Sequence, residues 1–170
     1  MQVAIREKRL VLPYADGMMN AREIAIRTAV LTDEAPVLTL LEELFEPPGA
    51  FPHGYTPERG REGFRHAVSR RDADVLLAVD GDLIIGMASV YKDYLSIRDG
   101  WRCWLQDLVV TKAHRGRGVG KALLDAASDW ARKRGCTHLD LSSGLGRIDA
   151  HRFYEREGME RGAYNFRRRL

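Results

Sequence analysis

One segment, "LQDLVVTKAHRGRGVGKALLDAAS" over residues 105–128, constrains the fold more than any other part of the sequence. An apolar run typical of a buried strand leads into a turn in which every second residue from 116 to 120 is glycine. The residues after the turn, about 118–134, carry apolar side chains at helical spacing. This order of strand, basic turn and helix predicts an α/β domain whose turn binds a ligand.

The turn combines backbone freedom with positive charge, which is the chemistry of an anion site. Glycine adopts positive φ without a steric penalty and lets the main chain approach a ligand closely. The first turn of the following helix has unpaired N–H groups and a partial positive charge, which together attract phosphate. Arg115 and Arg117 add positive side chains. We therefore expect this turn to hold the phosphates of a ligand.

Two common phosphate-binding motifs do not match the turn. A Walker loop requires GxxxxGK[ST], but Arg115 stands at its first glycine and Ala122 replaces the hydroxyl residue that binds Mg²⁺. The dinucleotide motif GxGxxG requires a third glycine where this chain has Lys121. The anion is therefore expected to belong to another class of ligand.

Length and composition favour one globular domain. A chain of 170 residues is long enough for one substantial core and short for two domains, and 45% hydrophobic with 30% charged residues is ordinary for a globular protein. Its longest apolar runs are too short to cross a bilayer, and the basic N-terminus lacks the apolar core of a signal peptide. We expect a cytoplasmic protein with no membrane partner.

The cysteines and the charge distribution argue against a disulfide-rich or metal-binding protein and against a nucleic-acid-binding protein. Cys103 and Cys136 are far apart and belong to no CxxC or Cys/His cluster, so neither a disulfide framework nor a metal site is indicated. The net charge is only +3, and the basic residues gather in "HRGRGVGK", "ARKRG" and "FRRRL". Aromatic residues are not interleaved with these arginines as in nucleic-acid-binding modules. A small anionic ligand fits these clusters better than a nucleic acid.

The apolar pattern of the chain predicts the element order β-α-α-β-β-β-α-β-α-β. Residues 1–20 are expected to form an arm or an extra strand before a single domain over residues 21–170. Thr32 is expected to cap the first helix, and Asp80-Gly81 to form the turn of a hairpin. Residues 46–60 and 92–100 are predicted as loops, 57–70 and 147–158 as helices, and 137–143 and 163–170 as strands.

Residues 115–120, "RGRGVG", have the form [R/Q]xxGx[G/A]. In its setting between strand and helix, this hexapeptide resembles the pyrophosphate-binding loop of the GNAT superfamily of N-acetyltransferases. Residues 149–159, "DAHRFYEREGM", are similar to this family's A-x-x-F/L-Y-E-x-x-G-F helix, with Met159 in place of the usual aromatic residue. Residues 26–30 and 33–44 are similar to the family's first strand and helix, so the resemblance covers about residues 23–170.

The resemblance implies a mixed, mainly antiparallel twisted sheet of about six to seven strands, flanked by about four helices. It implies an enzyme that moves the acetyl group of acetyl-CoA to a primary amine by direct attack in a ternary complex. The acceptor is expected to be a small molecule or a peptide, and a homodimer is expected. The alternative is a member of the same fold that binds or senses acyl-CoA without turnover.

The resemblance also assigns the cofactor site. The pantetheine arm is expected to pair like a strand with the backbone of Leu108 to Val110, at an edge where two strands splay apart beneath the loop. Arg147 stands where many relatives have a cofactor-contacting asparagine, and capping the loop is its alternative role. The residues expected to bind the cofactor are Leu108, Val109, Val110, Arg115, Gly116, Arg117, Gly118, Val119, Gly120, Lys121 and Arg147.

Tyr154 and Asp107 are the expected catalytic residues. Tyr154 matches the family's tyrosine general acid, which protonates the departing thiolate, although it also completes an apolar helix face. Strand alternation places Asp107 with Leu105 and Val109 on an otherwise apolar face, where desolvation raises the pKa of a carboxyl group toward that of a useful base.

Two points around this strand stay open. Many relatives have Glu where this chain has Gln106, so Asp107 is expected to act through water or, alternatively, to be a structural partner of an arginine or a turn. The oxyanion is expected at a backbone N–H near Leu108, where relatives have a bulge.

The acceptor site is expected between residues 46–55, 92–100 and 142–147, which form the acceptor pocket in relatives. These segments offer aromatic side chains with a few acids, a combination that suits a small amine. The residues in question are Phe51, Tyr55, Tyr94, Asp93 and Asp99.

Overall fold

The computed structural model describes residues 8–11, 23–163, 165–166 and 168. These residues form one six-stranded sheet in the order β1-β2-β3-β4-β5-β6, with four α-helices. The strands are β1 Lys8–Val11, β2 Glu23–Thr28, β3 Ala73–Asp80, β4 Leu83–Ser96, β5 Gly100–Val110 and β6 His138–Leu141. The helices are α1 Glu34–Phe45, α2 Pro57–Ser69, α3 Val119–Lys133 and α4 Ile148–Arg156, and the short 3-10 helices are η1 Leu31–Asp33 and η2 Lys112–His114. All neighbouring strands are antiparallel except β5 and β6, which confirms the predicted α/β class and mixed sheet.

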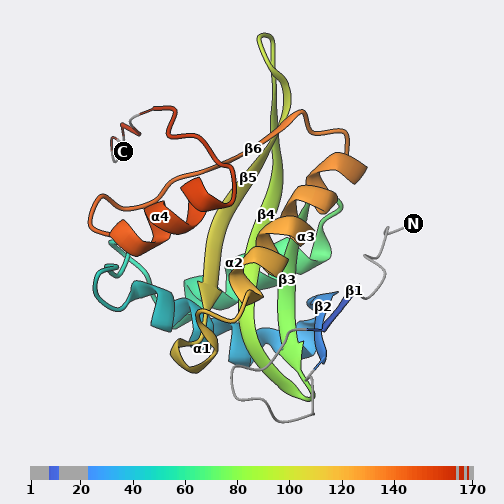
Figure 1. The fold of residues 1–170 in the computed structure, drawn as a ribbon, viewed down its shortest axis with the longest axis vertical. Helices are drawn as coiled ribbons and strands as arrows, with labels where there is room; N and C mark the ends of the chain where they lie inside the picture. The colour runs from blue at the N-terminus through green and yellow to red at the C-terminus, as the bar shows by residue number, and fades with distance from the viewer. Residues whose placement is uncertain (1–7, 12–22, 164, 167, 169–170) are drawn as a thin grey trace.

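The core consists of two apolar clusters, and helices lie on both faces of the sheet (Figure 1). Helix α3 covers one face, where Leu123 and Trp130 are fully buried. Helices α1 and α2 cover the other face. Strand β3 supplies both clusters, because its side chains alternate between Leu76 on the α3 side and Leu77 on the other.

The first helix begins later than the sequence predicts. Thr32 lies within η1, and α1 begins at Glu34. Asp33 is the N-cap residue, but its carboxylate accepts hydrogen bonds from the Arg27 guanidinium at 2.7 and 2.8 Å and from the Val30 N–H at 2.8 Å. The bonds to Arg27 lower the pKa of Asp33. This ion pair, rather than the Thr32 hydroxyl, fixes the junction between β2 and α1.

Residues 92–96 are not the loop that was predicted. Strand β4 continues to Ser96 and β5 begins at Gly100, so only residues 97–99 turn the chain. Figure 1 shows that the resulting β4–β5 ribbon projects beyond the rest of the domain. In a projecting ribbon both faces meet solvent, so polar side chains are compatible with strand pairing there.

A β-bulge interrupts the pairing of β4 with β5. Ser89 pairs with Asp107 and Val90 with Leu105, so Gln106 is an extra residue on β5. The extra residue reverses the alternation, so that Leu105 belongs to the α3 cluster while Asp107 shares the opposite face with Val109. The predicted placement of Asp107 beside Leu105 is therefore wrong, and the bulge lies at Gln106 rather than near Leu108.

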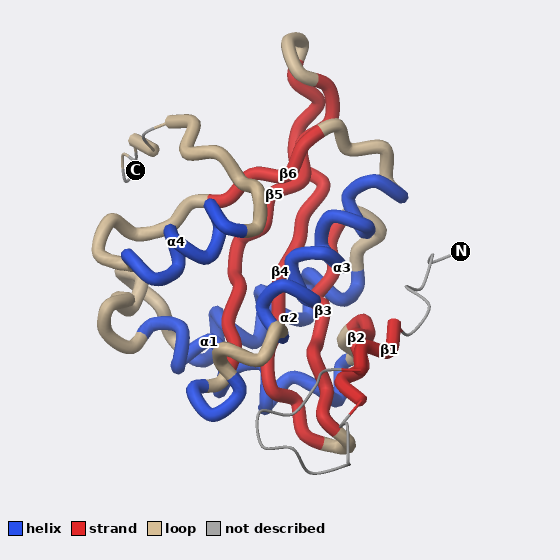
Figure 2. Tube along the Cα trace, in the orientation of Figure 1, coloured by secondary structure: helices blue, strands red, loops and turns tan. Residues whose placement is uncertain are grey.

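Strands β5 and β6 separate, as the resemblance implied. Their pairing runs only from Arg102 opposite His138 to Leu105 opposite Leu141, whereas β5 continues to Val110. After Leu141 the chain leaves β5 and runs to α4 (Figure 2). Within the described part of the chain, no strand therefore pairs with the backbone of residues 106–110 on the β6 side.

The two ends of the chain are described only in part. Strand β1 extends the sheet beyond β2, and the division between an extension over residues 1–20 and a domain over 21–170 stays a prediction. A closing strand was predicted over residues 163–170. The described residues there are not in a strand, and this also holds for residues 159–162; the described residues of the segment are 163, 165–166 and 168. The remaining residues of both segments lie outside the described part of the chain.

Candidate active site

The glycine-rich turn adopts the backbone that its sequence predicts. Gly116 and Gly118 have φ of 73° and 80°, in the left-handed region that favours glycine. Gly118 is the N-cap of α3 and has no side chain to cap the helix. The Ala122 N–H donates to the Gly118 carbonyl at 3.0 Å, and the three N–H groups before it, those of residues 119–121, have no intrahelical acceptor. This helix start has the geometry of an anion site.

The turn also lies close to α4. A Cβ built on Gly120 would lie 3.4 Å from Cζ of Phe153, so the main chain and the α4 side chain are in near contact. Val119 is fully buried in the α3 cluster, which leaves only its backbone available to a ligand. The expected contacts of Val119 and Gly120 with the cofactor are therefore main-chain contacts.

The basic side chains around the turn have protein partners. Arg115 donates from Nε to the Val110 carbonyl at 2.9 Å and forms an ion pair with Glu43 of α1 at 3.0 Å. Lys121 lies 3.1 Å from Asp125. The Arg115 side chain thus ties the turn to β5 and α1, a structural role that the sequence did not reveal. Arg117 is exposed.

Arg147 also has a partner that lies far away in the sequence. Its guanidinium donates to the carbonyl of Leu44 at the end of α1 and lies against Gly49. The start of α4 is thereby held next to the end of α1. The positive charge of Arg147 lowers the pKa of Tyr154, although burial outweighs this effect.

The unpaired edge of β5 offers its backbone rather than its side chains. Val109 is buried in the α1–α2 cluster, while Leu108 and Val110 pack against the α3 cluster. The Val110 carbonyl already accepts a bond from Arg115. A ligand that pairs with this edge would therefore use main-chain groups of residues 106–109 and adjoin Arg115.

Tyr154 is a neutral phenol at neutral pH. It is half-buried against the α3 cluster, with its ring 5.2 Å from that of Phe153 in an edge-on arrangement. Burial raises the pKa of Tyr154 to about 12, and the negative charge of Asp107 contributes in the same direction. The side chain can therefore donate a proton but does not release it to water.

Asp107 is half-buried on the opposite side of β5. Its carboxylate accepts a hydrogen bond from the Ser89 hydroxyl at 2.5 Å. Burial raises the pKa of Asp107, and the bond from Ser89 opposes this shift only in part. A carboxylate with a raised pKa is the stronger base that general base catalysis requires.

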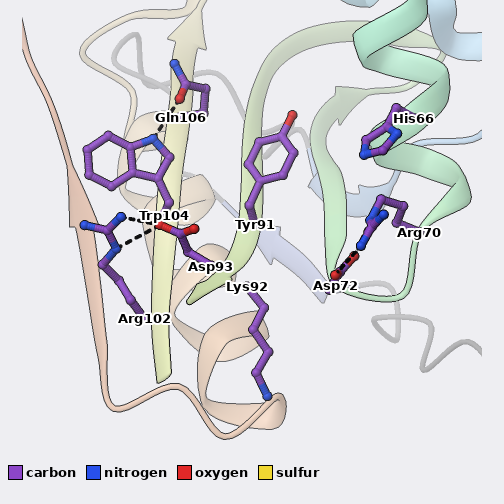
Figure 3. Close-up of a pocket in the computed structure, with 9 residues that line it drawn as sticks. All are labelled: His66, Arg70, Asp72, Tyr91, Lys92, Asp93, Arg102, Trp104 and Gln106. Atoms are coloured by element: carbon purple, nitrogen blue, oxygen red, sulfur yellow. Dashed lines mark hydrogen bonds and ion pairs between the residues drawn. The ribbon is translucent and has the colours of Figure 1, made fainter. Parts of the chain in front are cut away.

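A cavity of about 580 Å³ opens between α2 and the β4–β5 ribbon (Figure 3). This volume lies within the range of small-molecule sites. Gln106, the bulge residue, forms one end of the cavity, so the cavity begins next to Asp107. The lining residues are His66, Arg70, Asp72, Tyr91, Lys92, Asp93, Arg102, Trp104 and Gln106.

The two acids of the cavity are both paired with arginines. Arg70 contacts both oxygens of Asp72 at 2.6 Å, and Arg102 donates from Nε to Asp93 at 3.1 Å. Lys92 points away from the other lining residues, and its ammonium donates to a backbone carbonyl at the end of α3. The cavity is therefore nearly neutral and holds no unpaired carboxylate.

Most of the residues predicted for the acceptor site do not line this cavity, and their role stays a prediction. Phe51 and Tyr55 pack with Phe45, at ring distances of 5.3 and 5.0 Å, and do not line the cavity. Of the predicted residues only Asp93 lines it. Tyr91 and Trp104 were missed, because only the register of β4 with β5 places them opposite each other.

Comparison with known proteins agrees with this geometry. Residues 38–159 match the sequence model of the family described as Acetyltransferase (GNAT) family. The chain belongs to the GNAT acetyltransferase family. The family match supports acetyl-CoA as the cosubstrate and acyl transfer as the class of reaction. No helix in the described part of the chain is long and apolar enough to cross a membrane.

Two relatives are similar in sequence to this GNAT protein. The uncharacterized N-acetyltransferase YhdJ of Bacillus subtilis (strain 168) is 52% identical over 75 residues, which is 44% of this chain and 53% of the relative. The chain thus spans about half the length of that relative. Aminoalkylphosphonate N-acetyltransferase of Salmonella typhimurium is 33% identical over 110 residues, 65% of this chain and 71% of the relative.

Solved structures show the same fold. A transcriptional regulator from Bacillus halodurans C-125 has a TM-score of 0.75 at 25% identity, with 86% of this chain and 99% of that chain covered. The aminoglycoside N-acetyltransferase AAC(6')-Iy in complex with CoA has a TM-score of 0.78 at 18% identity, with 90% and 98% covered. At 18% identity the second likeness concerns the fold alone.

Proposed function

We propose that this GNAT protein is an N-acetyltransferase that moves the acetyl group of acetyl-CoA to a small primary amine by direct attack in a ternary complex. One observation carries the proposal: two sites meet at the bulge of β5. The glycine-rich turn and the unpaired edge of β5 lie on one side, and the cavity begins at Gln106 on the other. Acetyl-CoA supplies the thioester when it is bound.

The residues of the cofactor side fit a diphosphate and its pantetheine arm. The left-handed conformations of Gly116 and Gly118 and the unpaired N–H groups of residues 119–121 suit a diphosphate. The free backbone of residues 106–109 suits the amide groups of the pantetheine arm. Arg115 supports the turn through Glu43 and Val110 instead of being required as a ligand.

The acceptor side favours an amine whose other groups are neutral or anionic. A polycation such as a polyamine would need free carboxylates, but Asp72 and Asp93 are each paired with an arginine. Pairing with the arginines leaves some guanidinium N–H groups for an anionic substituent. The aminoalkylphosphonate specificity in the name of one relative supports such an acceptor.

Asp107, a backbone N–H of β5 and Tyr154 have the proposed roles of base, oxyanion donor and acid. Asp107 takes a proton from the acceptor ammonium, and the freed nitrogen forms the new C–N bond. A backbone N–H of β5 near Leu108 donates to the thioester oxygen as negative charge develops there. As the C–S bond breaks, Tyr154 gives its proton to the sulfur and regains one from the new amide nitrogen. The pKa of about 12 for Tyr154 exceeds that of a thiol in water, but burial beside the same apolar cluster also raises the basicity of the thiolate.

The second candidate function is acyl-CoA binding without turnover. It requires the cofactor side alone, and therefore does not account for the presence of Tyr154 and a cavity that ends at the bulge. The homodimer and the cytoplasmic location expected from the sequence stay predictions.

Two measurements test the proposed function. Acetyl-CoA at 100 times its Kd should stabilise the fold by about 2.7 kcal/mol, which raises the Tm by about 5–11 °C for a chain of this size. Thiol release is then measured with 2-aminoethylphosphonate, β-alanine, ethanolamine and spermidine. Release with the first three amines and little with spermidine is expected. A Tm shift without release for any primary amine favours the binding protein, and release that is fastest with spermidine contradicts the proposed acceptor class.

A further inference from the structure

The proposed base does not line the acceptor cavity. Asp107 is absent from the nine lining residues shown in Figure 3, and its carboxylate bonds to the Ser89 hydroxyl. An acceptor bound in the cavity therefore requires a group that connects its nitrogen to Asp107.

Tyr91 lines the cavity and lies on the same face of the sheet as Asp107. It lies on β4 two residues after Ser89 and therefore on the same face, and it pairs in register with Trp104. Ser89 pairs with Asp107, which makes Tyr91 and Asp107 diagonal neighbours across the two strands. In a regular ladder such neighbours have Cα atoms about 7–8 Å apart, within reach of an aromatic side chain, and here the bulge adds Gln106 between Leu105 and Asp107.

The Tyr91 side chain lines the cavity near Gln106. Figure 3 shows the ring between Trp104 and His66, with its hydroxyl directed toward the end of the cavity that Gln106 forms. Burial raises the pKa of Tyr91, and the negative charge of Asp107 raises it further. The same charge also acts on Tyr154, so Asp107 has one phenol on the acceptor side and one on the cofactor side. The other charged or titratable groups lining this cavity are His66, Arg70, Asp72, Lys92, Asp93 and Arg102.

We propose that Tyr91 is a further catalytic residue, which holds the acceptor nitrogen and passes its proton to Asp107. The N–H bond of the ammonium breaks as the proton moves to the Tyr91 oxygen, and the Tyr91 proton moves to the Asp107 carboxylate. Tyr91 remains a phenol, the ammonium becomes a neutral amine with a free electron pair, and the carboxylate becomes a carboxylic acid. Asp107 afterwards releases this proton to solvent. The inference rests on the proposed N-acetyltransferase function.

The Tyr91→Phe variant tests the relay, since it keeps the ring that packs against the cavity wall. Turnover with the best amine of the panel should fall about 10²-fold or more, while the Kd of acetyl-CoA stays unchanged. Thr39→Val is the control for loss of a hydroxyl, since Thr39 is exposed on α1, where its hydroxyl bonds to the Ala35 carbonyl, and does not line the cavity. Turnover of Tyr91→Phe within twofold of wild type at every pH would overturn the relay.

Two further measurements separate a relay from a structural role. In the Asp107→Asn background, Tyr91→Phe should lower turnover by less than about twofold more, because the two residues act as one unit. NMR titration of the Tyr91 ring, which needs no acceptor, should show a lower pKa for Tyr91 in Asp107→Asn than in wild type. An unmoved Tyr91 titration would overturn the inference whatever the activities are. If wild type bound acetyl-CoA and acetylated no amine, the proposed function would fail and this inference with it, whereas normal turnover by Tyr91→Phe alone would remove only the relay.

Discussion

Replacing Gly118 with alanine should weaken both the fold and the binding of acetyl-CoA. Gly118 has φ 80° and ψ −3° at the N-cap of α3, a conformation that costs an L-residue about 1–2 kcal/mol. For a chain of this length each kcal/mol corresponds to about 2–4 °C, so the Tm of Gly118→Ala should fall by about 2–8 °C. A turn that relaxes toward negative φ points its N–H groups away from the diphosphate. We therefore expect the Kd of acetyl-CoA, measured by calorimetry, to rise about 5- to 30-fold.

Gly63 provides a matched control for this substitution. It lies within α2 and a Cβ built on it would meet no atom within 4 Å, so Gly63→Ala should stabilise the fold by about 0.5–1 kcal/mol. The Kd of acetyl-CoA should not change in this variant. The reasoning would be refuted if Gly118→Ala were as stable as wild type and bound acetyl-CoA equally well, or if both glycine variants changed the Kd alike.

Three other substitutions or treatments have expected outcomes. Tyr154→Phe should lower turnover about 10²- to 10⁴-fold with the Kd of acetyl-CoA unchanged, and steady-state kinetics with full turnover would contradict its role as the acid. Asp107→Asn should slow turnover and yet raise the Tm at pH 8. The pKa of Asp107 is raised in the folded protein, so ionisation of this carboxyl group lowers the stability of the wild type as pH rises from about 4 through the folded pKa. Asparagine does not ionise and avoids this loss. The gain should vanish near pH 4, and a variant less stable than wild type at pH 8 would contradict this sign. Cys103 is fully buried and its pKa is raised to about 12, so a thiol reagent at pH 8 should not label it before the protein unfolds. Rapid labelling of Cys103 in the native protein would contradict its burial in the core.

The parts of the fold that depend on local signals were predictable. The turn before α3 follows from glycine and charge, and the structure places Gly116 and Gly118 in the left-handed region as expected. Helix α4 ends before Gly158, whose φ of 82° explains the helix stop that the sequence suggested. These features need no information from distant residues.

The errors come from features that depend on pairing between distant segments. A bulge adds one residue to a strand without changing its composition, so alternation alone placed Asp107 on the wrong face. The β4–β5 ribbon carries polar residues because it projects into solvent, and its sequence therefore resembles a loop. Arg115 and Arg147 have their partners in Glu43 and Leu44, which lie 72 and 103 residues away in the sequence.

A structure of this GNAT protein with bound CoA tests the central claim most directly. The account predicts that the diphosphate oxygens lie within hydrogen-bond distance of the N–H groups of residues 116–121, at the start of α3. It also predicts that the pantetheine arm runs along the unpaired edge of β5 and ends at the bulge beside Gln106. A diphosphate bound away from the turn, or a thiol that does not reach the bulge, would contradict the account.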